Sequence, residues 1–103
     1  MELKEMSDRI KSSALPVTTK IYEKNGINIT AIGLARGVEL IEHVVPCKVK
    51  LLVVKGEIDF NMDGQSSRLG CFESFEIPIN IKHSVVGWDE AIFLLIKDTT
   101  VRS

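Results

Sequence analysis

The chain has 103 residues, which is long enough for one domain with a hydrophobic core and too short for two. Hydrophobic residues make up 45% and charged residues 26%, with a formal net charge of −1, so the composition is that of a globular protein rather than a disordered one. Lys and Arg are scattered and no apolar run could span a bilayer, so neither a nucleic-acid partner nor a membrane is expected.

The N-terminal segment, residues 1–16, predicts a short helical arm. Leu3, Met6, Ile10 and Ala14 recur at spacings of three and four, and Pro16 ends the pattern. A helix this short is not stable alone and is expected to lie on a sheet or on a partner subunit. The first residues lack the apolar stretch of a secretory signal, which predicts a cytoplasmic protein.

Residues 17–103 predict a single all-β domain. Extended stretches at 17–24 and 27–34 flank Asn25-Gly26, and those at 57–62 and 65–69 flank Asp63-Gly64; both dipeptides are typical of type I′ hairpins. Further strands are expected at 38–45, 49–54, 75–77, 83–88 and 91–97, and Gly56 predicts a bulge or sharp bend. Many short strands with regular turn signals indicate a β-sandwich or β-barrel, and the pattern does not choose between them.

Alternation assigns side chains to faces within these strands. Over residues 38–45 it predicts that Glu39, Ile41, His43 and Val45 share one face. Over residues 57–62 it predicts that Ile58, Phe60 and Met62 point the same way. The two cysteines, Cys47 and Cys71, are expected to be reduced thiols, as is usual in the cytoplasm.

Two sets of spaced residues resemble the motifs of the cupins, a family of small jelly-roll β-barrels. Gly37, then five residues, then His43, with Gly56 further on, resembles the first cupin motif. Pro78, Asn80 and His83 resemble the end of the second motif, with Asn80 at a glycine position. Asn is the residue that best replaces glycine at positive φ. The resemblance implies a jelly-roll barrel with the short N-terminal helix attached.

The same resemblance implies a pocket with an incomplete set of metal ligands. In cupins, a second histidine and a glutamate of the first motif usually join the two matched histidines around a metal. Here Val45 and Val49 occupy those two positions, so His43 and His83 alone remain. A divalent transition metal (Zn, Ni, Fe or Mn) is therefore expected to bind weakly or not at all, because structural and catalytic sites normally have three or four protein ligands.

Several residues near this pocket have alternative interpretations. Cys47 is either a third metal ligand or a small buried hydrophobe at a corner, and the second is favoured. Glu39 is either an acid–base partner of His43 or a solvated glutamate. Trp88 either lines a rim or packs under the N-terminal helix, with packing favoured.

The leading functional hypothesis is a cytoplasmic cupin-like protein that binds a small organic molecule. His43 and His83 would anchor the ligand against apolar walls that include Val45, Val49 and Phe60. A homodimer is implied by the resemblance, with pairing through edge strands. The alternatives are a metal-dependent enzyme of the dioxygenase or isomerase type, and a purely structural barrel whose interior is filled by its own side chains.

Overall fold

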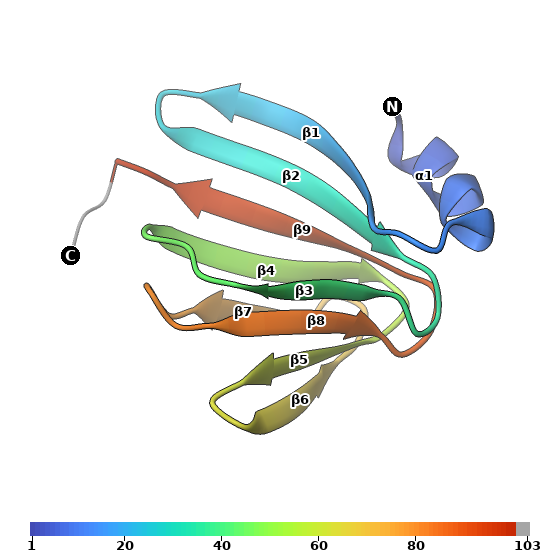
Figure 1. Ribbon diagram of the computed structural model, residues 1–103. Coiled ribbons are helices and arrows are strands. Elements are labelled where there is room, and N and C mark those ends of the chain that lie inside the picture. Colours follow the sequence, from blue (N-terminus) through green and yellow to red (C-terminus); the bar gives the residue numbers. More distant parts are fainter. Residues whose placement is uncertain (101–103) are drawn as a thin grey trace.

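The computed structural model describes residues 1–100, with the backbone alone at positions 42 and 43, and shows two antiparallel β-sheets packed face to face with a short N-terminal helix (Figure 1). One sheet has five strands in the order β1-β2-β9-β4-β7, and the other has four in the order β3-β8-β5-β6. The elements are α1 (Leu3–Arg9), a 3₁₀ turn η1 (Ile10–Ser12), β1 (Val17–Lys24), β2 (Ile27–Leu34), β3 (Glu39–His43), β4 (Lys48–Lys55), β5 (Ile58–Met62), β6 (Gln65–Leu69), β7 (Ser74–Ile77), β8 (His83–Gly87) and β9 (Ala91–Asp98).

Both predicted hairpins are present with the expected backbone conformation. Asn25 and Gly26 have φ of 52° and 84°, and Asp63 and Gly64 have φ of 52° and 73°. Positive φ at both central residues is what a type I′ turn requires, and it matches the twist of the flanking strands. The all-β prediction and the jelly-roll architecture are confirmed.

The main core lies between the two sheets. Alternate residues of the central strands point inward, so the burial pattern of β4 alternates between exposed and buried positions along its first half. The fully buried side chains include Leu51, Val53, Phe60 and Phe93, which belong to one contiguous cluster. This cluster contains residues from both sheets, so it holds the two layers together.

The N-terminal helix covers the outer face of the five-stranded sheet. Met6 and Ile10 are fully buried there and pack with Ala31 of β2 and Ile92 of β9. The helix is shorter than predicted. It ends in the 3₁₀ turn at Ser12, and the Ser13 hydroxyl is hydrogen-bonded to the backbone of Leu15 in place of a further helical turn.

Gly33 allows this helix to approach the sheet closely. A methyl group built on Gly33 would lie 2.5 Å from Cγ2 of Ile10 and 3.0 Å from Cγ of Met6. We therefore expect Gly33→Ala to lower the free energy of unfolding by about 1–3 kcal/mol, as overpacking does. In an Ile10→Ala background the same change should cost less than half as much, because the closest contact is gone. Urea denaturation of the four proteins measures this coupling, and equal costs in both backgrounds would contradict the close contact.

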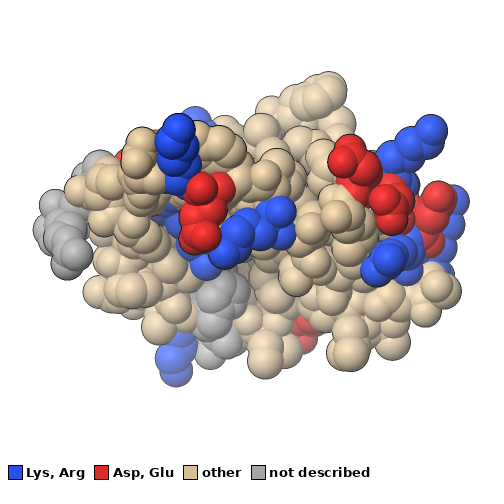
Figure 2. Space-filling model, turned by 90° about the horizontal axis from the view of Figure 1, so that it is seen from above, with Lys and Arg blue, Asp and Glu red and all other residues tan. Residues whose placement is uncertain are grey.

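Most of the charged side chains that are visible from above β1 lie in two separate areas (Figure 2). One is the N-terminal helix, where Lys11 and Asp8 are 3.9 Å apart. The other is the β1–β2 hairpin, where the ammonium of Lys20 lies 3.0 Å from the Glu23 carboxylate. The hydrogen bond from Lys20 holds the pKa of Glu23 below its ordinary value. In both areas, opposite charges lie side by side.

A β-bulge in β3 changes the predicted facing of that strand. Leu40 pairs with Val85 and His43 pairs with His83, so the two residues between the paired positions of β3 lie opposite a single residue of β8, Ser84. Ile41 and Val45, which were predicted to share one face, therefore do not, because one extra residue reverses the alternation between them. The same prediction for His43 concerns a side chain outside the described residues. Ile41 is 74% exposed, whereas Val45 packs against the core.

Among residues 1–100, no helix is both long enough and apolar enough to cross a bilayer.

Candidate functional site

His83 begins β8 and lies inside the sandwich, where it is 2% exposed. Its Nδ1 is 3.1 Å from the carbonyl oxygen of Ile81. A carbonyl can only accept a hydrogen bond, so Nδ1 carries the hydrogen and donates it. The imidazole also stacks on the ring of Phe60, with centroids 5.5 Å apart and an interplanar angle of 21°. One backbone carbonyl and one aromatic ring thus hold the orientation of the imidazole.

The second predicted histidine, His43, occupies the backbone position directly opposite His83. The two residues are Cα partners in the β3–β8 ladder, immediately beyond the bulge. The side chain of His43 lies outside the described part of the structure. The fold thus brings the two backbone positions together, although they are far apart in the sequence.

The three apolar residues predicted to line the pocket are all in or against the core. Val49 is 3% exposed and Phe60 is 2% exposed, and Val45 packs against the same cluster while remaining partly accessible. Phe60 also contacts Phe75, with ring centroids 4.8 Å apart. Around His83, the interior is therefore closely packed by its own side chains.

A backbone hydrogen bond joins two chain connections next to this position. The N–H of Asn80, in the β7–β8 connection, donates to the carbonyl of Val45, in the β3–β4 connection, at 3.0 Å. Asn80 has φ of 61°, so the glycine-like conformation suggested by the motif match is confirmed. The conformation of Asn80 and this bond together hold the two connections against each other.

The remaining candidate ligands lie in different surroundings. Cys47 packs against the core as a partly buried side chain, and both cysteines are free thiols. Cys71 is exposed, and its Sγ is 3.3 Å from the carbonyl oxygen of Val54. Glu39 is exposed at the start of β3. Among the side chains that the structure describes, no three His, Cys, Asp or Glu residues are grouped so that they could hold a metal ion.

Trp88 is on the surface, and the prediction that it packs under the N-terminal helix is wrong. Its side chain is 46% exposed, and the guanidinium carbon of Arg68 lies 3.6 Å from the ring centroid. Arg68 also donates two hydrogen bonds to the Asp59 carboxylate, at 2.9 and 3.3 Å, which raise the pKa of Arg68 above its ordinary value. No local sequence signal indicates this cluster, because its residues come from β5, β6 and the segment after β8.

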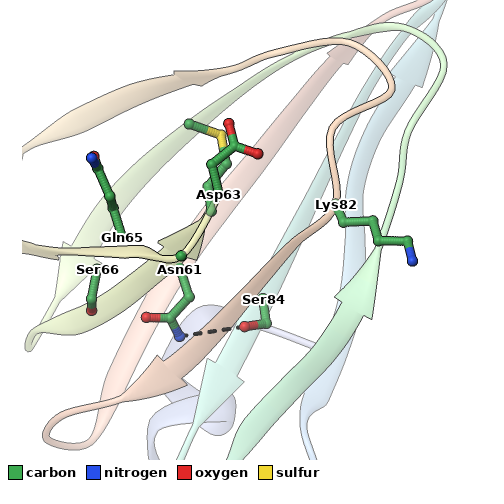
Figure 3. Close-up of a pocket in the computed structure, with 8 residues that line it drawn as sticks. Asn61, Asp63, Gln65, Ser66, Lys82 and Ser84 are labelled. Carbon is green, nitrogen blue, oxygen red and sulfur yellow. Dashed lines mark hydrogen bonds between the residues drawn. The ribbon is translucent and has the colours of Figure 1, made fainter.

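One hollow, of about 330 Å³, lies beside the β5–β6 hairpin and has a mainly polar lining (Figure 3). Within it, Asn61 and Ser84 point toward each other and are joined by a hydrogen bond of 3.3 Å. Asp63 and Gln65 extend away from that pair. The polar groups therefore do not converge on one point where a ligand atom could bind. A second hollow, of about 450 Å³, lies on the five-stranded sheet.

No model of a known family matches this sequence, and no curated protein matches it either. Solved structures do match. An RmlC-like cupin from Shewanella frigidimarina NCIMB 400 has a TM-score of 0.77 and 20% identity, covering 85% of this chain and 79% of that one. A cupin superfamily protein from Desulfitobacterium hafniense DCB-2 has a TM-score of 0.76 and 18% identity, covering 81% and 76%.

A third match covers almost the whole of both chains. It is a cupin-2 domain containing protein from Shewanella frigidimarina NCIMB 400, with a TM-score of 0.75 and 15% identity over 95% of this chain and 93% of that one. Identities this low establish similarity of fold, not of activity. The resemblance to cupins that the spacing of Gly37, Asn80 and the two histidines suggested is thus confirmed at the level of the fold. This chain has the jelly-roll fold of the cupins.

Proposed function

We propose that this chain is a small-molecule-binding cupin domain whose ligand is anchored by His83 between the β3–β4 and β7–β8 connections. The observation that carries the proposal is the fixed imidazole of His83, buried at the register position opposite His43. Histidines that bind ligands or metals are commonly oriented by a hydrogen bond from the other ring nitrogen, and here Ile81 supplies the acceptor.

The chemistry around His83 limits what it would bind. With the hydrogen on Nδ1, a neutral ring presents Nε2 as a hydrogen-bond acceptor or a metal ligand. The surrounding walls, Phe60, Val45 and Val49, are apolar. These walls fit a ligand with an apolar body, and Nε2 of His83 fits one hydrogen-bond donor on that ligand. A divalent transition metal (Zn, Ni, Fe or Mn) fits this site poorly, because Val45 and Val49 supply neither a ligand atom nor a negative charge beside the imidazoles. We therefore expect such a metal to be held weakly.

Entry of a ligand requires local opening. His83 is 2% exposed, and the bond between the Asn80 N–H and the Val45 carbonyl holds the adjoining connections together. Short connections with few buried contacts are the segments of a protein that open at the lowest free energy. The proposed route therefore passes between these two connections.

A filled structural barrel is the second candidate, and the burial of the same residues favours it. His83, Phe60 and Val49 are each 3% exposed or less, and the aromatic rings of Phe60 and Phe75 pack against each other beside the histidine. Small β-barrels can be filled completely by their own side chains. In that case His83 would be a core residue held by its bond to Ile81.

Binding measurements on protein purified without an affinity tag distinguish the two candidates. We expect Ni²⁺ and a library of small organic molecules to shift the amide NMR signals of His83, Phe60 and Val45 in the wild-type protein. In His83→Phe, which keeps an aromatic ring of similar size, binding should fall at least tenfold, about 1.4 kcal/mol or more. Glu39→Gln, on the exposed start of β3, is the control and should bind as the wild type does.

Two results would reject ligand binding at His83. The first is unchanged affinity in His83→Phe, which would place any binding elsewhere. The second is the absence of any shift at these residues across the library, which would favour the filled barrel.

Homodimerisation, and residence in the cytoplasm, stay predictions. The edge strand β1 carries a register shift between Lys20 and Tyr22 and exposed charged side chains, including Lys20 and Lys24. Bulges and lysines on an edge strand oppose pairing with another edge. Sedimentation equilibrium gives the stoichiometry directly. If a dimer forms through β1, Thr19→Pro in this edge strand should weaken it.

A further inference from the structure

The N-terminal helix covers only one end of the outer face of the five-stranded sheet. Met6 and Ile10 pack there on Ala31 of β2 and Ile92 of β9. The β1–β2 hairpin lies at the other end of the same strands, away from the helix (Figure 1). The outer face near this hairpin therefore carries side chains that the helix does not reach.

A row of apolar side chains crosses this uncovered end. Tyr22, Ile29 and Ile96 are successive cross-strand partners on β1, β2 and β9. Ile29 lies two residues from Ala31, which packs with the helix, so both belong to the outer face. Tyr22 is 49% exposed, and Ile29 and Ile96 are partly exposed, as is Ile27 next to them. We refer to Tyr22, Ile27, Ile29 and Ile96 as the outer patch.

The sequence of β9 is typical of a strand that is covered on both faces. Residues 91–96 are all apolar, whereas a strand with one face in water usually alternates between apolar and polar residues. The core covers Phe93 and Leu95, and the helix packs with Ile92. Ile96 belongs to neither apolar cluster of the described residues and lines the second hollow instead. A further apolar surface is therefore expected to cover Ile96 and the outer patch.

The second hollow, of about 450 Å³, adjoins the outer patch at Ile96 and has charged side chains with balanced signs. Lys50 of β4 is the cross-strand partner of Glu76 on β7, and Lys48 is the partner of Asp98 on β9. Opposite charges in such positions attract each other. The lining thus carries two positive and two negative charges, so it favours neither anions nor cations.

A surface with this composition can face a second copy of itself. In a two-fold symmetric dimer, the same surface of both copies meets, so a patch with a large net charge would repel its copy. The balanced lining avoids that repulsion and allows the lysines of one copy to face the carboxylates of the other. Lys24, the partner of Ile27 on β1, adds one positive charge at the rim of the outer patch.

We propose that the outer patch and the adjoining hollow form the interface of a homodimer in which the five-stranded sheets of two copies pack face to face. Ile29 and Ile96 form the apolar centre, and the lysines and carboxylates of the hollow form a polar rim. Contact through a face leaves the edge strand β1, with its bulge, unpaired. The interface is separate from His83, which lies in the other sheet and faces the core.

Sedimentation equilibrium over a range of protein concentrations tests the apolar centre. We expect the wild-type protein to dimerise and Ile29→Thr/Ile96→Thr to raise the dissociation constant at least tenfold. Threonine is also β-branched, so the strands should be retained. Ile41→Thr is the matched control, because Ile41 is 74% exposed on β3 of the other sheet, and its dissociation constant should equal that of the wild type. His83→Phe should also dimerise as the wild type does.

Mixing two charge-reversed variants tests whether the polar rim acts between copies. Lys50→Glu leaves one lysine and three carboxylates in the hollow, whereas Glu76→Lys leaves three lysines and one carboxylate. Each variant alone should dimerise at least tenfold more weakly than the wild type. An equimolar mixture should form a heterodimer at least tenfold tighter than either homodimer, and added salt should weaken it. Attraction within one chain cannot produce this recovery.

Four results would overturn the proposal. The first is a wild-type protein that stays monomeric at its highest soluble concentration. The second is a dimer that Ile29→Thr/Ile96→Thr leaves intact and Thr19→Pro disrupts, which would place the interface at the β1 edge. The third is a mixture of the charge-reversed variants that forms no heterodimer. The fourth is a monomer that binds the dye 1-anilinonaphthalene-8-sulfonate with shifts in the amide NMR signals of Ile29 and Ile96, which would indicate a small-molecule site.

Discussion

Gly56→Ala is expected to lower the free energy of unfolding by about 3–5 kcal/mol, among the largest effects of a single substitution. Gly56 lies between β4 and β5 with φ of 71°. An added methyl group would lie 2.0 Å from the carbonyl oxygen of Glu90, a backbone atom that cannot rotate away. The connection must therefore move, and it carries the chain from one sheet to the other. Urea denaturation followed by circular dichroism gives the change directly.

Gly64→Ala is the matched control for this substitution. Gly64 has nearly the same backbone conformation, with φ of 73°, but nothing lies within 4 Å of the added methyl group. Its cost should be the conformational penalty alone, about 1–2 kcal/mol. The difference between the two variants isolates the contact with Glu90. Equal costs would mean that the β4–β5 connection can shift freely.

Phe60→Ala is expected to lower the free energy of unfolding by about 3–5 kcal/mol. The Phe60 side chain is 2% exposed and contacts both Phe75 and His83 through its ring. Its removal leaves a cavity next to the imidazole and eliminates two ring contacts. Thermal and urea unfolding measure the loss.

The size of that loss also distinguishes a packed interior from an open one. A cavity cost is large only where the surroundings are already filled and cannot collapse. Phe60→Leu, which keeps most of the volume, should cost much less, about 1 kcal/mol. If Phe60→Ala costs little more than Phe60→Leu, the space around His83 is loosely packed, and the open ligand pocket gains support over the filled barrel.

Local sequence signals correctly predicted the features that depend on neighbouring residues. Asn25-Gly26 and Asp63-Gly64 form the predicted turns because few residue pairs tolerate two consecutive positive φ values. The motif match also correctly predicted the backbone conformation of Asn80. Of the four residues predicted to form the apolar face of the helix, Met6 and Ile10 are buried, whereas Leu3 and Ala14 are exposed. The helix was also predicted to reach Ala14, two residues beyond the 3₁₀ turn that ends at Ser12.

Features that depend on contacts between distant segments were predicted less well. The face of Ile41 was wrong because the bulge in β3 is set by pairing with β8, and alternation alone does not reveal an inserted residue. Phe72 has φ of 70°, which is unusual for a bulky residue, so its residue type gave no signal for this conformation. Its N–H donates to the carbonyl of Val53, a distant residue in the sequence, at 2.7 Å. Trp88 was predicted to pack under the N-terminal helix, whereas it is 46% exposed at the surface with the Arg68 guanidinium over its ring.

The sequence by itself determined the all-β class, the turns and the two histidine positions, because hydrophobic alternation and positive-φ residues act over a few neighbouring positions. Only the tertiary structure decided that His43 and His83 are register partners, that His83 is buried, and that Lys48, Lys50 and Ile96 meet at one hollow. These outcomes follow from the order of the strands in the two sheets, where neighbours such as β4 and β9 are distant in the chain. Pairing between distant strands depends on the free energy of the whole packed core, which no short stretch of residues encodes.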